Sequence, residues 1–345
     1  MSELRDWAEL LRVSALFTVP GDVLAGAAAS GRRPGAATAL AVGASLCLYE
    51  AGMALNDWAD RDEDAAERPH RPVPSGRIAP GQALAAAAVL TGAGLGLGFA
   101  AGRPAAWCAT ALAGTVWAYD LGLKHTAAGP AAMAAARGLD LLMGAVATAG
   151  PSAGHPPAGP SAGATVAAPA GAGAGPSAGG TAGAVRRALL PAAALGAHTY
   201  ALTTVSRAET RGGAWGGPLA ALGVTAVLGA LVGTDGRSGP AARWRRSGPA
   251  GALGVPGAPG TPGGPGGLGR AVLAGGYVVT AGRPLVHAVL NPSPALTQRA
   301  VGGGIRALIP LQAALAARSG APVSAALLAG LVPVARRLAG KVSPT

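Results

Sequence analysis

Long apolar blocks, separated by short polar segments, dominate this sequence. Each approaches the roughly 20 residues that an α-helix needs to cross about 30 Å of hydrocarbon. The blocks cover residues 12–30, 36–55, 82–101, 105–121, 130–149, 187–206, 216–234, 298–317 and 321–339. A weaker block at 268–289 is either a further span or an interfacial helix. Because backbone polar groups must be satisfied inside lipid, we expect an all-α, polytopic transmembrane helical bundle of about nine spans, or ten if the weaker block also crosses.

The composition supports a surface that faces lipid. Only 12% of the residues are charged, whereas a soluble domain usually carries about 25%. The formal net charge is +12, but arginines between apolar spans usually set topology and contact anionic lipid. Since no nucleic-acid-binding motif is present, the expected partner is the lipid bilayer and not nucleic acid. The start of the chain lacks a signal-peptide pattern, so the spans themselves predict a multi-pass protein of the cell membrane.

Two stretches of low complexity interrupt the apolar blocks. Residues 150–184 and 236–268 are rich in Gly, Pro and Ala, and such segments can neither bury a core nor hold a helix. We therefore expect one membrane domain over residues 1–345, with these two stretches as flexible loops.

Three polar clusters follow even-numbered spans. They run from Asn56 to Arg77, from Tyr119 to Lys124 and from Ser206 to Glu209. Because successive spans alternate in direction, we expect all three clusters on one face of the membrane, where they would form one site. The four arginines in the first cluster favour the cytoplasmic side, although the arginines of the 236–268 loop would then lie outside.

The first cluster is the most acidic part of the chain. Six of the fifteen acidic residues lie between positions 57 and 67, and acids this close repel one another unless a cation neutralises them. Asn56, Asp60 and Asp64 are spaced at i, i+4 and i+8, on one helical face, and Asp57 shares that face at i, i+3 and i+7 with the two later acids. Mg²⁺ prefers one or two carboxylates together with phosphate oxygens. The spacing therefore predicts a Mg²⁺ site at the membrane surface, against the simpler alternative of a solvated charged loop.

A basic segment follows the acids directly, with the sequence ERPHRPVPSGR at residues 67–77. Arg68, Arg71 and Arg77 suit the binding of a diphosphate, because a guanidinium group makes paired hydrogen bonds to phosphate. The prolines of this segment favour an ordered, extended loop over a helix.

Residues 51–64, AGMALNDWADRDED, and residues 68–76, RPHRPVPSG, together resemble the first Asp-rich motif of the UbiA superfamily of intramembrane prenyltransferases. Tyr119 and Lys124 resemble the Tyr and Lys that this family carries after its fourth helix. The segment from His198 to Glu209 falls where the family has its second Asp-rich motif. There Glu209 is the only acid, which sets the chain apart from the well-studied quinone-pathway members and is compatible with a less characterised, EboC-like bacterial branch.

The resemblance implies Mg²⁺-dependent transfer of a prenyl group from an isoprenyl diphosphate to a lipophilic acceptor whose identity the sequence does not disclose. It assigns catalysis to Asp60, Asp64 and Lys124. Metal binding would fall to Asn56, Asp57, Asp60, Asp64 and Glu209, and diphosphate binding to Arg68, Arg71, Arg77, Lys124 and Arg207. The pocket would include Tyr119, Tyr200, Arg137 and Asp140.

The pocket residues have simpler alternatives. The two tyrosines are equally well explained as interfacial anchors, and Arg137 and Asp140, three residues apart, as an ion pair with each other. Two other functions also stay open: a transporter whose acidic patch binds cations, and a catalytically silent relative. A CDP-alcohol phosphatidyltransferase is a poor match, because its Asp-containing signature is not present.

Overall fold

The computed structural model describes residues 2–12, 16, 18–150, 180–207, 215–234 and 265–342. Over these residues the chain forms α-helices, the short 3-10 helix η2 (Leu123–His125) and no β-strand, which confirms the all-α prediction. The α-helices are α1 (Ser2–Leu10), α2 (Val19–Ser30), α3 (Ala36–Ala59), α4 (Arg61–Glu67), α5 (Pro80–Ala101), α6 (Arg103–Leu121), α7 (Gly129–Ala149), α8 (Thr181–Ser206), α9 (Gly216–Gly233), α11 (Pro265–Leu290), α12 (Pro294–Arg318) and α13 (Pro322–Val342).

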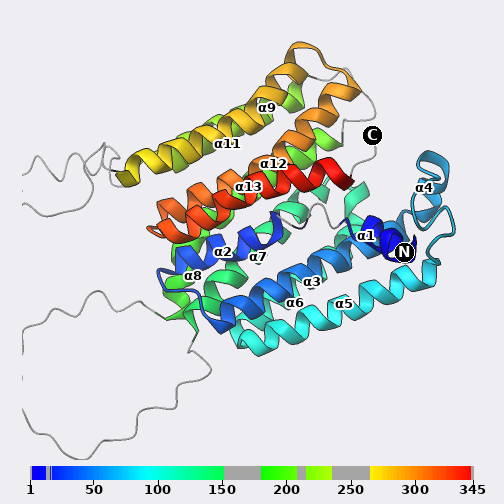
Figure 1. Cartoon of the computed structure of the whole chain (residues 1–345), viewed down its shortest axis with the longest axis horizontal. Helices are drawn as coiled ribbons and strands as arrows, with labels where there is room; N and C mark the ends of the chain where they lie inside the picture. The colour runs from blue at the N-terminus through cyan, green and yellow to red at the C-terminus, as the bar shows by residue number, and fades with distance from the viewer. Residues whose placement is uncertain are drawn as a thin grey trace, which may run out of the picture.

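The long helices lie side by side as a bundle (Figure 1). Among the described residues, α3, α5, α7, α8, α9 and α12 are long and apolar enough to cross a membrane. The helices α6, α11 and α13 have 19, 26 and 21 residues. The weaker block at 268–289 lies within α11, one continuous helix that packs on α9 and α12. The chain is a multi-pass membrane protein with roughly the predicted number of long helices.

Three predicted boundaries shift. Residues 12–30 were expected to form one span, but α2 begins only at Val19, with a proline in its first turn, and has 12 residues. Most of the two low-complexity stretches lies outside the described residues, yet α8 and α11 begin at Thr181 and Pro265, inside the ranges expected to be loops. Proline suits the first turn of a helix because its missing N–H needs no partner there.

Small residues let neighbouring helices approach closely. A Cβ atom added to Gly144 on α7 would lie 2.1 Å from the backbone oxygen of Val23 on α2. A Cβ added to Gly26 on α2 would lie 1.9 Å from the backbone oxygen of Leu141 on α7. In lipid the hydrophobic effect does not drive helices together, so close packing between their backbones stabilises the pair instead. The α2–α7 pair is thereby fixed in the centre of the bundle, next to α3, α8 and α12.

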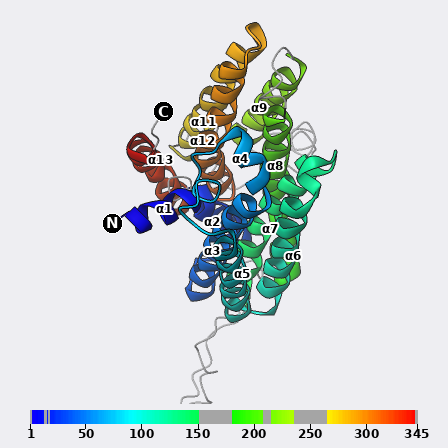
Figure 2. The ribbon, with the colours of Figure 1, turned by 90° about the vertical axis from the view of Figure 1, so that its right-hand side faces the viewer.

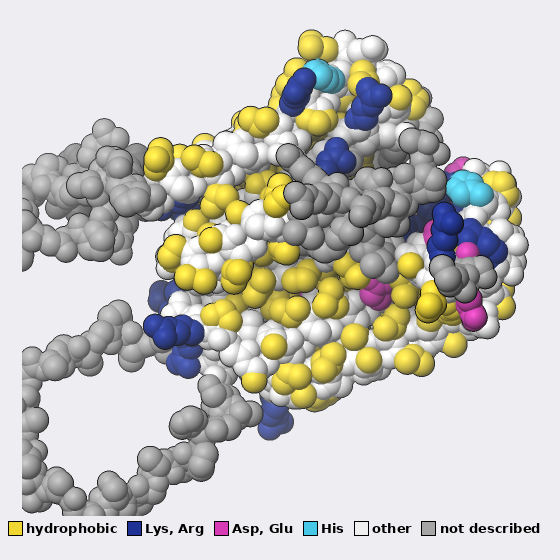
Figure 3. Space-filling model, viewed as in Figure 1, with side chains coloured by type: hydrophobic (Ala, Val, Ile, Leu, Met, Phe, Trp, Pro, Cys, Tyr) yellow, Lys and Arg dark blue, Asp and Glu magenta, His cyan; other side chains and the backbone are white. Residues whose placement is uncertain are grey.

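Charge is confined mainly to the ends of the bundle. On the face in Figure 3, hydrophobic side chains cover the middle, and the acidic side chains gather mainly at the end that carries α1 and α4. Figure 2 looks onto this end and shows α1 and α4 in front of the long helices. The polar clusters after α3, α6 and α8 meet here, since Lys124 contacts Asp60 and Arg207 donates a hydrogen bond to the backbone oxygen of Thr126.

Candidate active site

The acidic segment is split between two helices. α3 ends at Ala59, α4 begins at Arg61, and Asp60 between them has φ −91° and ψ 6°. Helical hydrogen bonds continue through the break, from Asp60 N–H to the Asn56 oxygen at 2.9 Å and from Asp64 N–H to the Asp60 oxygen at 2.7 Å. Because the helix breaks at Asp60, the acids do not all share the single helical face that the spacing predicted. They form two groups instead.

The first group surrounds the ammonium of Lys124. The Asn56 side-chain amide donates to Asp60 and to Asp120, with both distances 3.1 Å. Lys124 Nζ lies 2.5 Å from Asp60 Oδ1 and 3.9 Å from Asp120 Oδ1. The side chains of Lys124 and Asp120 are 8% and 5% exposed. Two carboxylates from α6 and the α3–α4 junction thus converge on one cation in a largely dry site.

The second group contains the buried carboxylates of Asp57 and Asp64. Arg71 lies 2.5 Å from Asp64 and 3.5 Å from Asp57. Arg12 lies 3.3 Å from Asp57, and Arg68 lies 3.5 Å from Asp64. Buried carboxylates need such partners, because an unpaired buried charge is strongly destabilising. The arginines of the basic segment therefore neutralise the acids of the same motif.

Arg77 lies apart from both groups. It contacts Asp6 and donates to Glu9 of α1 at 2.9 and 3.1 Å, and it donates to the backbone oxygen of His70 at 2.6 Å. The hydrogen bond with Glu9, together with the contact to Asp6, raises the pKa of Arg77 above its usual value, so this side chain stays protonated. In this arrangement Arg77 ties α1 to the loop before α5 and does not reach the carboxylates of the motif.

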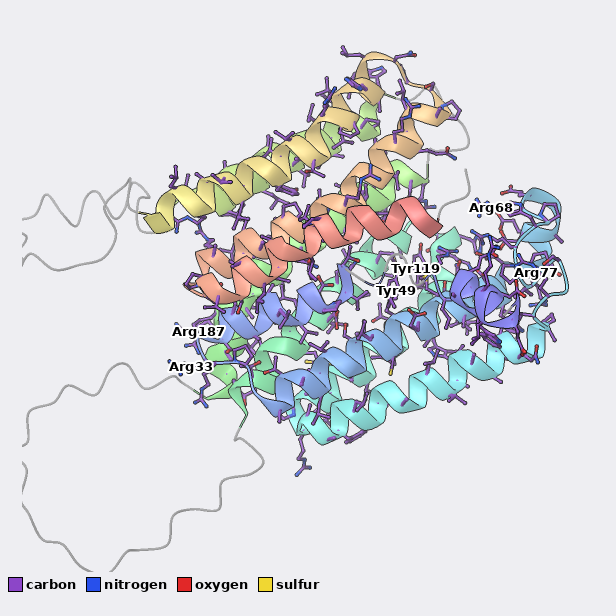
Figure 4. All side chains as sticks on the ribbon, in the orientation of Figure 1. Arg33, Tyr49, Arg68, Arg77, Tyr119 and Arg187 are labelled. Carbon is purple, nitrogen blue, oxygen red and sulfur yellow. The ribbon has the colours of Figure 1, made fainter. Side chains whose placement is uncertain are left out.

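A cavity of about 310 Å³ opens beside the first group. Its polar lining at the outer end comes from Arg12, Asn56, Tyr119 and Asp120, and at the inner end from Ser45, Tyr49, Arg137 and Asp140. The walls between are mainly apolar, with side chains such as Leu48, Met53, Leu112, Val116 and Met133. Figure 4 labels Tyr49 and Tyr119 close to each other, nearer to the end that carries Arg68 and Arg77 than to the end that carries Arg33 and Arg187.

Three of the four predicted pocket residues line the cavity. Tyr119, Arg137 and Asp140 line the cavity, whereas Tyr200 on α8 does not and is 49% exposed. Arg137 and Asp140 do not pair as the i, i+3 alternative suggested, since Arg137 binds Asp22 at 2.6 Å. Asp140 instead accepts a hydrogen bond from Ser45 at 2.7 Å.

Arg207 and Glu209 complete the list of predicted site residues. Arg207 lies at the end of α8, where it contacts the loop that follows η2. Glu209 lies outside the described residues.

Sequence reasoning missed two members of the site. Asp120 directly follows Tyr119 and stands four residues before Lys124, so it shares a helical face with that lysine. This spacing was a usable signal. Arg12 ends the amphipathic N-terminal segment and contacts Asp57, 45 residues away, which no local pattern indicates.

The donor set fits Mg²⁺ only with further ligands. Asp carboxylates and an Asn amide are oxygen donors of the kind that Mg²⁺ prefers. Within the described residues, no group of three or more His, Cys, Asp or Glu side chains is close enough to hold one metal ion. Pairs of carboxylates are present, and Mg²⁺ in proteins commonly adds phosphate oxygens and water to one or two carboxylates. The residues therefore fit a metal ion that arrives together with a diphosphate.

Fold and site together define the class as an integral membrane protein with a cluster of paired acidic and basic side chains at the outer end of a mainly apolar cavity. Residues 14–213 match the UbiA prenyltransferase family. The match covers more than half of the chain, and the chain therefore belongs to this family.

Similar proteins match over part of their length. A digeranylgeranylglyceryl phosphate synthase of Ignicoccus hospitalis is 34% identical over 148 residues, which are 43% of this chain and 48% of that protein. A 4-hydroxybenzoate octaprenyltransferase of Ralstonia nicotianae is 48% identical over 65 residues, which are 18% of this chain and 22% of that protein. The match thus spans about half, or less, of these relatives.

The fold has solved counterparts. The apo structure of a UbiA homologue from Aeropyrum pernix K1 superposes with a TM-score of 0.59 at 18% identity, over 87% of this chain and 96% of that chain. At this identity the likeness concerns the fold alone.

Proposed function

We propose that this protein transfers a prenyl group from an isoprenyl diphosphate to a lipophilic acceptor within the membrane, with Mg²⁺ as cofactor. The observation that carries the proposal is the meeting of Asp60, Asp120 and Lys124 at the outer end of a cavity with apolar walls. A prenyl diphosphate has the same division, with a charged head and an apolar tail. The named relatives are consistent with such substrates, because their names describe prenyl or geranylgeranyl chemistry.

The cations of the site would hold the leaving group. When the allylic C–O bond breaks, negative charge develops on the departing diphosphate, and pre-positioned cations stabilise that charge. Lys124, Arg71 and Arg68 now neutralise carboxylates of the motif, and we expect them to bind diphosphate oxygens when substrate is present. Arg207 lies at the same end of the bundle and is a further candidate.

The carboxylates would hold the metal. Asn56, Asp57, Asp60 and Asp64, together with Glu209, are the proposed Mg²⁺ ligands, and bound Mg²⁺ would polarise the diphosphate and neutralise its charge. Metal and diphosphate would replace the ammonium and guanidinium groups that face these acids in the structure. Asp60 and Asp64 matter most in this scheme, because each belongs to one of the two acidic groups.

The cavity would protect the reacting carbon. Its mainly apolar walls exclude water, which would otherwise capture the allyl cation and give a prenyl alcohol. The Tyr119 ring lines the cavity and suits contact with a cationic carbon through its π face. The acceptor nucleophile forms the new bond to the first prenyl carbon and releases its proton.

We place the Asp-rich end on the cytoplasmic side. The segment between α3 and α5 is short and contains Arg61, Arg68, Arg71 and Arg77, and short loops rich in arginine usually stay in the cytoplasm.

Diphosphate release tests the proposal. The purified protein in liposomes receives geranyl, farnesyl or geranylgeranyl diphosphate and a membrane-lipid extract as the acceptor source, with Mg²⁺ or with EDTA. We expect Mg²⁺-dependent release that falls about a hundredfold or more in Asp60→Ala and Asp64→Ala. The control is Asp62→Asn, since the Asp62 side chain is 90% exposed and, among the residues that the structure describes, pairs only with Arg61 at 3.6 Å. Release that is equal in Asp60→Ala and in wild type would reject the assigned site.

A further inference from the structure

At the inner end of the cavity, one buried carboxyl oxygen has no hydrogen-bond partner in the described part of the chain. Asp140 on α7 lines this end and is 5% exposed. Its Oδ2 accepts from the Ser45 hydroxyl at 2.7 Å, whereas its Oδ1 has no partner among the residues that the structure describes. Leaving a buried acceptor unpaired is unfavourable. The geometry therefore calls for a donor from a ligand.

The cation at this end, Arg137, is already paired with a carboxylate. Arg137 is neutralised by Asp22, at 2.6 Å, and Asp22 also accepts from the Gln312 amide at 2.6 Å. Asp22 is fully buried, so this pair is shielded from water. Among the described residues Asp140 forms no ion pair, so the inner end of the cavity is unfavourable for a second carboxylate.

We propose that the inner end of the cavity binds the far hydroxyl of a neutral acceptor, which donates a hydrogen bond to Asp140 Oδ1. This inference rests on the proposed function and names the acceptor class. A carboxylate at this position would face Asp140 across a low-dielectric site, and a hydrocarbon would leave Oδ1 unpaired. A neutral hydroxyl donates the missing hydrogen bond and brings no further charge to the inner end.

The length of the cavity adds a second property of the acceptor. Ser45 precedes Asn56 by eleven residues on α3, which corresponds to about 16 Å along the helix axis. The reacting prenyl carbon must lie near the diphosphate, at the Asn56 end. The acceptor is therefore elongated, with its nucleophile toward the Asn56 end and its hydroxyl at Asp140.

Direct binding tests the proposal with three phenols of the same shape. The probes are biphenyl phenols whose second ring ends in a hydroxyl, a carboxylate or a hydrogen atom. Calorimetric titration uses the full-length protein in detergent, without prenyl diphosphate. We expect the hydroxyl-ended probe to bind at least about tenfold more tightly than the other two, which is the usual contribution of a hydrogen bond to a charged group.

Two variants separate the hydrogen bond from general packing. Asp140→Asn replaces the carboxyl group by an amide of the same size that can donate to a carboxylate, so we expect it to strengthen binding of the carboxylate-ended probe about tenfold, a gain that misfolding cannot produce. The control is Thr148→Val on the same helix, because Thr148 is buried, bonds to Thr38 and Gly144, and does not line the cavity. It should leave the order of the three probes unchanged.

Three outcomes would overturn the inference. They are equal binding of all probes, preference for the carboxylate-ended probe by the wild type, and an unchanged hydroxyl-to-carboxylate ratio in Asp140→Asn. Because no prenyl diphosphate is present, these results are independent of catalysis. If the wild type released no diphosphate from any prenyl diphosphate but kept the probe preference, the proposed function would be rejected and this binding site would stand.

Discussion

Asp120 shows how much of the site depends on contacts between distant residues. It is 64 residues from Asn56, whose amide it binds at 3.1 Å, and its side chain is 5% exposed. It stands where α6 ends, beside the same ammonium that faces Asp60. Asp120 therefore helps to orient Asn56 and Lys124. The sequence had already indicated both of these residues, but not Asp120.

We expect Asp120→Asn to weaken metal binding. Residues that orient metal ligands commonly change affinity by about 10–100-fold, and the substitution removes a charge from the group around Lys124. Mn²⁺ binding in the presence of inorganic diphosphate, followed by electron paramagnetic resonance, measures the affinity, and thermal unfolding checks the fold. Glu63→Gln, an exposed acid of α4, is the matched control. Wild-type Mn²⁺ affinity in Asp120→Asn would show that Asp120 has no part in the site.

At the scale of helices, the α2–α7 contact positions the inner end of the cavity. α7 supplies Arg137 and Asp140, and α2 supplies Asp22, which binds Arg137. The two backbones approach closely only because Gly26 and Gly144 have no side chains. A change in the spacing of these helices should therefore disturb both stability and the buried ion pair.

Gly144→Ala should destabilise the protein by about 1–3 kcal/mol, the usual range for overpacking in a tight core. The new Cβ atom would meet backbone atoms of Val23, which cannot move aside as a flexible side chain would. Gly114→Ala on α6 is the control, because a Cβ there meets nothing within 4 Å, and alanine favours helix. Thermal unfolding in one detergent compares them, and a Gly144→Ala midpoint at or above that of wild type would contradict the packing account.

The sequence predicted the helices and the end of the bundle that holds the site, but not how the acids divide. Spacing at i, i+4 and i+8 places Asn56, Asp60 and Asp64 on one face only if the helix is continuous. The break at Asp60 retains the helical hydrogen bonds on both sides, so no local propensity reveals it. The partner of Arg137 could not be predicted either. The sequence offered Asp140, three residues away, whereas in the fold Arg137 pairs with Asp22, which is 115 residues away in the chain.

At the scale of the whole molecule, basic residues lie at both ends of the bundle. Figure 4 shows Arg33 and Arg187 at one end, and Arg68 and Arg77 at the other. A count of positive charge alone therefore determines the orientation poorly. The short loop between α3 and α5 is the better guide, since the positive-inside rule holds best for short loops.

Cysteine labelling tests the orientation. In a variant without Cys47 and Cys108, Ser75→Cys and Arg33→Cys would each introduce one thiol at an exposed position, at opposite ends of the bundle. With the Asp-rich end in the cytoplasm, a membrane-impermeant maleimide should label Arg33→Cys in intact spheroplasts. It should label Ser75→Cys only after lysis. The reverse pattern would place the site outside.

The central claim is that acids at the outer end of an apolar cavity activate a prenyl diphosphate for transfer to a lipid. The most direct measurement incubates membranes containing the protein with radiolabelled geranylgeranyl diphosphate and Mg²⁺, then separates the lipid extract by chromatography. We predict a labelled lipid that is not the free prenyl alcohol, and that disappears with EDTA and in the Asp60→Asn, Asp64→Asn double variant. A labelled product that persists in the double variant, or label found only in the alcohol, would contradict the account.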